Sequence, residues 1–140
     1  MVNPPKRGIN SDEVCDLYQL EKKNILDNLK RKAKLTSDKL ANTYKMSCNP
    51  MTGALYVFPR VHMTESAVKA ARSVGAEPDS FYCVEMLNAT GLMVVPGNGF
   101  RQKEGTYHFR MSNLIYNYDE LSKVLDGIDA FNRQFFAKYN

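Results

Sequence analysis

Residues 106–112 read Thr-Tyr-His-Phe-Arg-Met-Ser, a stretch in which apolar and polar side chains alternate. Three apolar residues fall on one side of an extended chain and three polar residues on the other: Tyr107, Phe109 and Met111 against His108, Arg110 and Ser112. A period of two is typical of a strand with one face buried against a core. The stretch therefore predicts one strand of a half-buried sheet.

Helical patterns lie on both sides of this strand. From Val14 to about Tyr44 the chain has no proline or glycine, and Ser11 offers an N-cap, so we expect one long helix or two in line. Shorter helices are predicted over Thr64–Val74 and from Pro78 to Gly91, and a last one after Asn117. The apolar stripes expected on the long, third and last helices are Val14, Leu17, Tyr18, Ile25, Leu29, Leu40 and Tyr44; Phe81, Val84 and Leu87; and Leu121, Val124, Leu125, Ile128, Phe131 and Phe135.

Short strands complete the pattern. Met46–Cys48 and Ala54–Phe58 are expected to pair with each other around a turn, and Leu92–Val95 forms a further strand. The glycines of Pro96-Gly97-Asn98-Gly99 predict a tight loop, because glycine adopts backbone angles that other residues resist.

The order of elements predicts an α+β fold with a small mixed or antiparallel sheet, covered by helices and preceded by a long N-terminal helix. Residues 1–10 contain Pro4, Pro5 and Gly8 and are expected to be an extended lead-in segment. Residues 11–140 are then one domain, which is all that 140 residues with 44% hydrophobic content normally build.

The composition argues against several classes of protein. No run approaches the ~20 apolar residues that span a bilayer, and the N-terminus lacks the apolar run of a signal peptide. The net charge of +4 lies largely between Lys22 and Lys39, without aromatic residues, which favours a solvated helix face over a nucleic-acid site. Three widely spaced cysteines form no CxxC motif, so we expect reduced thiols in an intracellular protein and no metal centre.

Motifs that carry a nucleophile, a phosphate loop or a metal cluster are absent from the sequence. Arg110 is unusual because it stands mid-strand between Phe109 and Met111. One interpretation is an arginine on the solvent face of the sheet. The other is an arginine that binds a carboxylate through its planar fork of donors.

The run GLMVVPGNGFRQKEGTYHFRMSNL, residues 91–114, resembles the closing segment of alanine aminotransferases. Three further motifs resemble that family in the same order: MVNPP at the start, TGALYVFPRV at residues 52–61 and PDSFYCVEML at residues 78–87. The resemblance covers nearly the whole chain and implies the carboxyl-terminal small domain of a fold-type-I pyridoxal-phosphate aminotransferase.

The resemblance also implies an activity. Such an enzyme is a homodimer that binds pyridoxal 5′-phosphate and transfers an amino group between L-alanine and 2-oxoglutarate, giving pyruvate and L-glutamate. Arg110 falls on the family's arginine for the substrate α-carboxylate. Tyr56 falls where related enzymes place an aromatic residue at the edge of the substrate pocket, and core packing is an equally good interpretation of it.

The family's Schiff-base lysine segment has no match in this sequence. We therefore expect no catalytic and no cofactor-binding residue here, and an isolated chain without activity. Two alternatives stay open: an independent binding or dimerisation module, and the small domain of a related aminotransferase for another small amino acid. No nucleic-acid or membrane partner is expected, and residence is cytoplasmic or, as a second option, mitochondrial.

Overall fold

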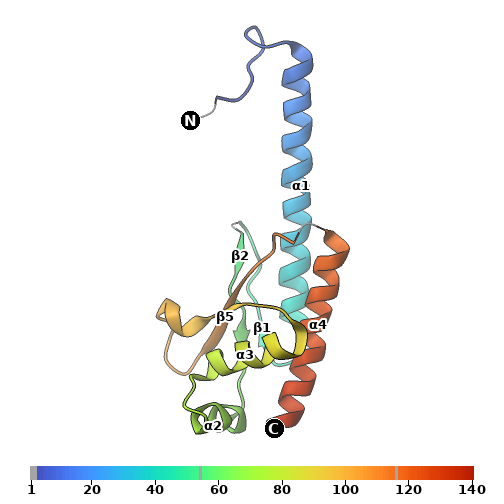
Figure 1. The fold of residues 1–140 in the computed structure, drawn as a ribbon. Helices are drawn as coiled ribbons and strands as arrows, with labels where there is room; N and C mark the ends of the chain where they lie inside the picture. The colour runs from blue at the N-terminus through green and yellow to red at the C-terminus, as the bar shows by residue number, and fades with distance from the viewer. Residues whose placement is uncertain (1–2, 54, 116) are drawn as a thin grey trace. The chain divides into compact units, whose positions relative to one another are not determined.

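A computed structural model describes residues 3–53, 55–115 and 117–140 (Figure 1). The chain divides into two compact units, Met1–Arg31 and Lys32–Asn140. Helix α1 (Asp12–Asn42) contains the boundary between them and confirms the predicted long helix.

Unit 1 contains a tight turn followed by the first part of α1. The backbone N–H groups of Ile9 and Asn10 both donate to the Lys6 carbonyl, at 3.1 and 2.9 Å. Gly8 lies in the left-handed region at φ 85°, which only glycine adopts without strain. The Ser11 hydroxyl accepts from the N–H of Val14 at 3.4 Å, so Ser11 caps the helix as predicted.

Unit 2 contains the end of α1 and all remaining elements. In chain order these are β1 (Met46–Ser47), β2 (Tyr56–Val57), β3 (Arg60–Val61), α2 (Glu65–Ser73), α3 (Pro78–Thr90), β4 (Val95–Pro96), the 3₁₀-helix η1 (Gly97–Phe100), β5 (Tyr107–Ser112) and α4 (Tyr118–Lys138). The predicted α+β class is confirmed, and every predicted helix is present. Gly91 ends α3 in the left-handed conformation expected of a C-cap glycine.

The sheet is built around β5, and all of its pairings are antiparallel. Strands β2 and β3 pair with the same edge of β5 in one continuous register, with Tyr56 opposite Ser112 and Arg60 opposite His108. They are one strand interrupted near Pro59, whose carbonyl still accepts from the N–H of Phe109 at 3.4 Å. Strand β4 pairs with the other edge of β5, and β1 pairs with β3.

The predicted hairpin of Met46–Cys48 and Ala54–Phe58 is wrong. Strand β1 pairs with β3, and β2 pairs with β5, fifty residues further along the chain. The turn residues between the two segments are a local signal, whereas the pairing is decided by the apolar face of β5. Residue Ala54 lies outside the described residues. The strand predicted at Leu92–Val95 is present but shifted, and pairs only at Val95 and Pro96.

Helices pack on one face of this sheet (Figure 1). Val57, Val61, Phe109 and Met111 point into a core shared with the buried residues of α3 and α4. Figure 1 shows α3 crossing the strands. Side chains of the opposite parity on the same strands are left on the outer face.

The last helix follows its predicted stripe, but the third does not. Buried in α4 are Leu121, Leu125, Ile128, Phe131 and Phe135. In α3, Val84 and Leu87 are exposed, and the helix instead buries Tyr82, Cys83 and Met86. Apolar residues surround α3 on several sides, so their spacing does not define one face. The hydroxyl of Tyr82 donates to Asn132 of α4, which satisfies its polar end in the core.

Across the described residues, none of the helices is both long and apolar enough to cross a membrane.

We expect the isolated chain to self-associate through unit 1. The helix exposes Val14, Leu17 and Ile25 at 47%, 56% and 60%, and several large apolar side chains exposed on one helix favour contact with other molecules. Sedimentation velocity at several concentrations should show the isolated chain associating. Replacing both Leu17 and Ile25 by lysine should weaken the association.

Val74→Lys is the matched control, because Val74 is 66% exposed but lies in unit 2. A chain that stays monomeric at high concentration, or a control as disruptive as the double variant, contradicts the prediction.

Candidate functional site

The outer face of the sheet carries the candidate site. Along β2 and β3 it presents Tyr56, Phe58 and Arg60, and along β5 it presents His108, Arg110 and Ser112. Tyr56 and Phe58 are 54% and 41% exposed, whereas His108 and Arg110 are half-buried. Strand alternation puts all of these side chains on the side away from the core.

Arg110 lies among aromatic rings rather than beside an acid. The carbon of its guanidinium lies over the ring of Tyr56, 4.6 Å from the centroid, and over the ring of Phe100 at 5.0 Å. Among the described residues, Arg110 makes no ion pair. Ring faces attract the charge without occupying the N–H donors of the guanidinium. The donors of Arg110 therefore stay available for a carboxylate.

The structure thus brings together the two site residues named from the sequence, Arg110 and Tyr56. Sequence reasoning missed Phe58 and Phe100 as their neighbours. Phe58 shares the parity of Tyr56 along the strand, and this alternation could have identified it. Phe100 belongs to η1 and carries no periodic signal, so only the fold places it over Arg110.

A second layer of rings lies next to Arg110. Phe58 stacks face to face on the imidazole of His108, with ring centroids 4.8 Å apart and planes 3° apart. Phe58 also meets the ring of Phe100 edge-on at 5.6 Å. The rings of Tyr56, Phe58, Phe100 and His108 therefore form one aromatic surface beside the Arg110 guanidinium.

A polar network anchors the loop that carries Phe100. The carboxylate of Asp79, in the first turn of α3, is only 3% exposed and accepts three hydrogen bonds. The donors are the N–H of Ser80 at 2.9 Å, the N–H of Asn98, and the side-chain amide of Gln102 at 2.8 Å. The other end of the Gln102 amide contacts Nδ1 of His108 at 2.8 Å. Asp79 is thus linked through Gln102 to His108.

Gly97 is required in this loop by close approach, not by its backbone angles. A Cβ atom at this position would lie 2.3 Å from Oε1 of Gln102 and 2.8 Å from the carbonyl oxygen of His108. The segment is also one turn of 3₁₀-helix rather than a simple turn, and the left-handed residue is Arg101, at φ 52°. The loop expected from the sequence is present, but the predicted reason for its glycines is wrong, because neither Gly97 nor Gly99 has a positive φ.

The environment of His108 favours its neutral form. Partial burial lowers the pKa of its imidazole, the charge of Arg60 lowers it further and His62 adds a little, whereas Asp79 acts in the opposite direction. The amide of Gln102 donates to Asp79 through its nitrogen, so its oxygen must accept from Nδ1–H of His108. The neutral imidazole is therefore the Nδ1–H tautomer, with Nε2 free to accept.

Two cysteine thiols of unit 2 are poor nucleophiles. Burial and the nearby Asp79 charge raise the pKa of the Cys83 thiol to about 12, and burial raises that of Cys48 as well. Neither thiol is activated, because the thiolate is the reactive form. Among the residues described, no group of His, Cys, Asp and Glu side chains is arranged to hold a metal ion.

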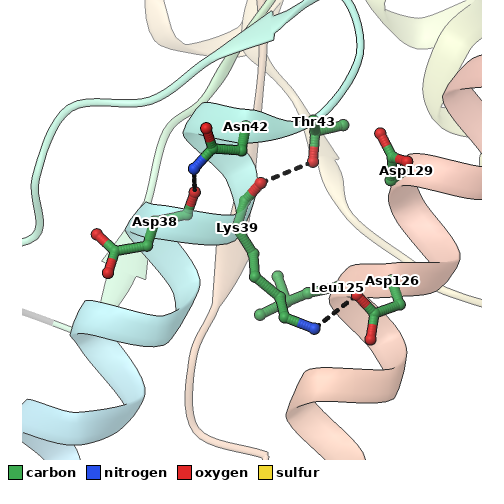
Figure 2. A pocket seen from close by; sticks show the side chains of 7 residues that line it. All are labelled: Asp38, Lys39, Asn42, Thr43, Leu125, Asp126 and Asp129. Atoms are coloured by element: carbon green, nitrogen blue, oxygen red, sulfur yellow. Dashed lines mark hydrogen bonds and ion pairs between the residues drawn. The ribbon is translucent and has the colours of Figure 1, made fainter.

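A hollow between the end of α1 and α4 is a weaker candidate (Figure 2). Seven residues line it: Asp38, Lys39, Asn42, Thr43, Leu125, Asp126 and Asp129. Figure 2 shows the Lys39 ammonium bonded to Asp126, and Lys39 also donates to the Ser122 hydroxyl at 2.9 Å. Asp129 accepts from the N–H of Tyr44 and from Arg133, both at 2.9 Å or less. These polar groups satisfy one another and hold the helices together.

Pyridoxal 5′-phosphate does not fit the outer face of this chain by itself. The cofactor needs an amine to hold it, and none of the residues on that face is a lysine. Four described lysines are occupied by carboxylates elsewhere: Lys23, Lys34, Lys39 and Lys138. The face offers the guanidinium of Arg110 but, among its described residues, no amine for covalent attachment.

Comparisons with known proteins agree with the resemblance seen in the sequence. The chain is 42% identical over all 140 residues to alanine aminotransferase 2 of Xenopus tropicalis, and 42% identical over 139 residues to a probable mitochondrial alanine aminotransferase of Dictyostelium discoideum. It is 40% identical over 140 residues to glutamate–glyoxylate aminotransferase 1 of Arabidopsis thaliana. The chain spans 25–28% of the length of these relatives. No family model matches it.

Solved structures show the same fold. An alanine aminotransferase from Pyrococcus furiosus aligns with 80% of this chain at a TM-score of 0.64, over 25% of its own length. An aspartate aminotransferase from Rhizobium meliloti aligns with 86% of it at 0.57, over 27% of its own length. Both are 21% identical in sequence to this chain, so they show the fold alone.

The environment of His108 predicts a dependence of stability on pH. Because its folded pKa lies below the ordinary value of about 6.5, the unfolded chain takes up the proton first as the pH falls. The free energy of unfolding should therefore decrease as the pH is lowered through about 6.5, and level off once folded His108 is also protonated. An NMR titration of the His108 ring should give a midpoint below that value.

Urea unfolding between pH 5 and 8 supplies the second measurement. His108→Asn should remove this part of the pH dependence, and His62→Gln assigns the remaining ring signal. A His108 midpoint at or above about 6.5 contradicts the prediction.

Proposed function

We propose that this chain, which is homologous to alanine aminotransferases along its whole length, forms the carboxyl-terminal small domain of an enzyme that transfers an amino group between L-alanine and 2-oxoglutarate. Residues 11–140 form that domain and residues 1–10 lead into it. The observation that carries the proposal is Arg110: a half-buried arginine without an ion-pair partner in the described structure, held among aromatic rings on the outer face of the sheet.

Arg110 is the substrate-binding residue in this proposal. Alanine, glutamate, pyruvate and 2-oxoglutarate share an α-carboxylate, and a guanidinium can donate two parallel hydrogen bonds to it. The rings of Tyr56 and Phe100 hold the cation in place before the substrate arrives. Tyr56, whose ring is half exposed, also forms an edge of the substrate pocket.

The chemistry itself is supplied from elsewhere. Pyridoxal 5′-phosphate, when bound, acts as the electron sink of amino-group transfer, and we propose that the parent enzyme binds it mainly outside this chain, as a homodimer inside the cell. This chain contributes the carboxylate receptor and the apolar walls around it. None of its residues is proposed to move a proton.

A related reaction is the second candidate. The 40% identity to a glutamate–glyoxylate aminotransferase favours a shared α-carboxylate receptor with a different oxo acid. Assaying the complete enzyme with pyruvate and with glyoxylate as competing amino acceptors decides between the two. A non-enzymatic binding module, the third candidate, predicts no transfer to either acceptor by the complete protein.

The isolated chain should not transaminate, because the outer face carries no lysine to hold the cofactor. Incubation with pyridoxal 5′-phosphate, alanine and 2-oxoglutarate should give no pyruvate above a blank without protein. Colour from imines on surface lysines is not a positive result. Sustained turnover by homogeneous chain would show that the proposed division of labour is wrong.

Replacing Arg110 by alanine in the complete enzyme should lower kcat/KM by roughly two to three orders of magnitude. Truncating one partner of a partly desolvated, hydrogen-bonded charge pair costs about 2–5 kcal/mol, and ~1.4 kcal/mol is tenfold. Both half-reactions should suffer, because every substrate carries the α-carboxylate. Arg110→Lys should recover only part of the loss, since it keeps the charge but not the fork.

Rapid kinetics of each half-reaction and a melting curve are the measurements. Ser112→Ala is a matched control, because Ser112 lies next along the same face of β5. Near-normal kinetics in a destabilised Arg110→Ala variant would assign Arg110 to folding rather than to substrate binding.

A further inference from the structure

We propose that Asp79 and Gln102 are positioning residues, which anchor loop η1 to helix α3 and so hold the Phe100 ring over the guanidinium of Arg110. The proposal rests on the function proposed above, because it concerns the residue that binds the substrate carboxylate. Neither Asp79 nor Gln102 contacts the exposed donors of Arg110. They act through the loop.

Asp79 is the fixed end of this arrangement. Its carboxylate is almost fully buried at 3% exposure, and a buried charge is tolerated only when it is well hydrogen-bonded. Two of its three donors, the N–H of Asn98 and the amide of Gln102, come from the η1 segment and the residues just after it. Without the loop, this carboxylate would lose most of its partners. Burial of Asp79 therefore ties the loop to α3.

Gln102 connects Asp79 to strand β5 of the sheet. Its nitrogen donates to Asp79 at 2.8 Å and its oxygen accepts from Nδ1 of His108 at 2.8 Å, so one side chain joins α3 to β5. An ionised carboxylate can only accept, so Gln102 directs its amide nitrogen to Asp79 and its oxygen to Nδ1–H of His108. Gly97 lies against the same amide, where even a methyl group would meet Oε1 of Gln102 and the backbone of His108.

Phe100 lies in the chain between these two anchors. Asn98 is held two residues before it and Gln102 two residues after it. The Phe100 ring is 42% exposed, so burial alone does not fix it. Its neighbours are the Phe58 ring and the Arg110 guanidinium. Releasing either anchor should leave the ring free to move away from Arg110.

The first test follows His108 in this chain by ¹⁵N NMR at pH 8. In the unmodified chain Nδ1 should carry the proton. In Gln102→Ala and in Gly97→Ala, which displaces the Gln102 amide by a different route, the Nδ1–H tautomer should lose its predominance. Lys103→Ala is the control, because Lys103 is an exposed neighbour whose side chain makes no ion pair in the described structure.

The second test measures kinetics in the complete enzyme. Both Gln102→Ala and Asp79→Asn should weaken the contact of the Phe100 ring with the Arg110 cation. We therefore expect KM for both alanine and 2-oxoglutarate to rise about three- to tenfold, with kcat changed less than about twofold. Lys103→Ala should leave both constants unchanged. A purely structural role would instead lower the melting temperature and leave KM unchanged in the folded fraction.

The outcomes separate the two proposals. If Arg110→Ala raises KM strongly but neither Gln102→Ala nor Asp79→Asn does, the positioning role is overturned and the proposed function stands. If Arg110→Ala itself leaves the kinetics unchanged, the proposed function fails. If the Nδ1–H tautomer persists in Gln102→Ala, the proposed link from Asp79 through Gln102 to His108 is overturned, even where the kinetics change.

Discussion

Strand β5 is paired on both edges, and this constraint determines where almost everything else in unit 2 lies. One edge takes β2 and β3 in a single register, and the other takes β4. With both edges occupied, a slip by one residue would expose Phe109 and Met111 and bury Arg110. The burial of two large apolar side chains thus fixes the direction in which the arginine points. The packing of the core and the position of Arg110 on the outer face therefore follow from the same register.

The buried Asp79 carboxylate adds a second constraint, which acts across the sequence. It joins the start of α3 to a loop about twenty residues later, and the loop then meets β5 through Gln102. The site is therefore assembled from three separate segments: the strand with Tyr56, the loop with Phe100 and the strand with Arg110. None of these segments forms the site alone.

The sequence predicted those parts of the structure whose signal is local. Alternation identified β5 and the face of Arg110, and residues typical of helix starts, Ser11, Pro78 and Asn117, identified three of the helices. Strand partners were not predicted correctly, because pairing of β1 with β3 and of β2 with β5 depends on register between distant segments. The buried face of α3 was missed because apolar residues occur on several of its sides, and the core contacts of Tyr82, Cys83 and Met86 with distant segments select one. The roles of Phe100 and Asp79 were not predicted either, because they depend on contacts with distant residues and not on a periodic pattern in the sequence.

An arginine held by rings differs from one held by acids in how it responds to salt. The distances of 4.6 and 5.0 Å from the Arg110 guanidinium to its two rings are shorter than the Debye length of ≈ 8 Å at physiological ionic strength. Dissolved ions therefore do little to loosen the cation from its rings. They do compete for its unoccupied donors, because no carboxylate of the described chain has already neutralised the charge. Ionic strength should thus alter how strongly an anion binds the guanidinium, while the arrangement of Arg110 and its two rings stays the same.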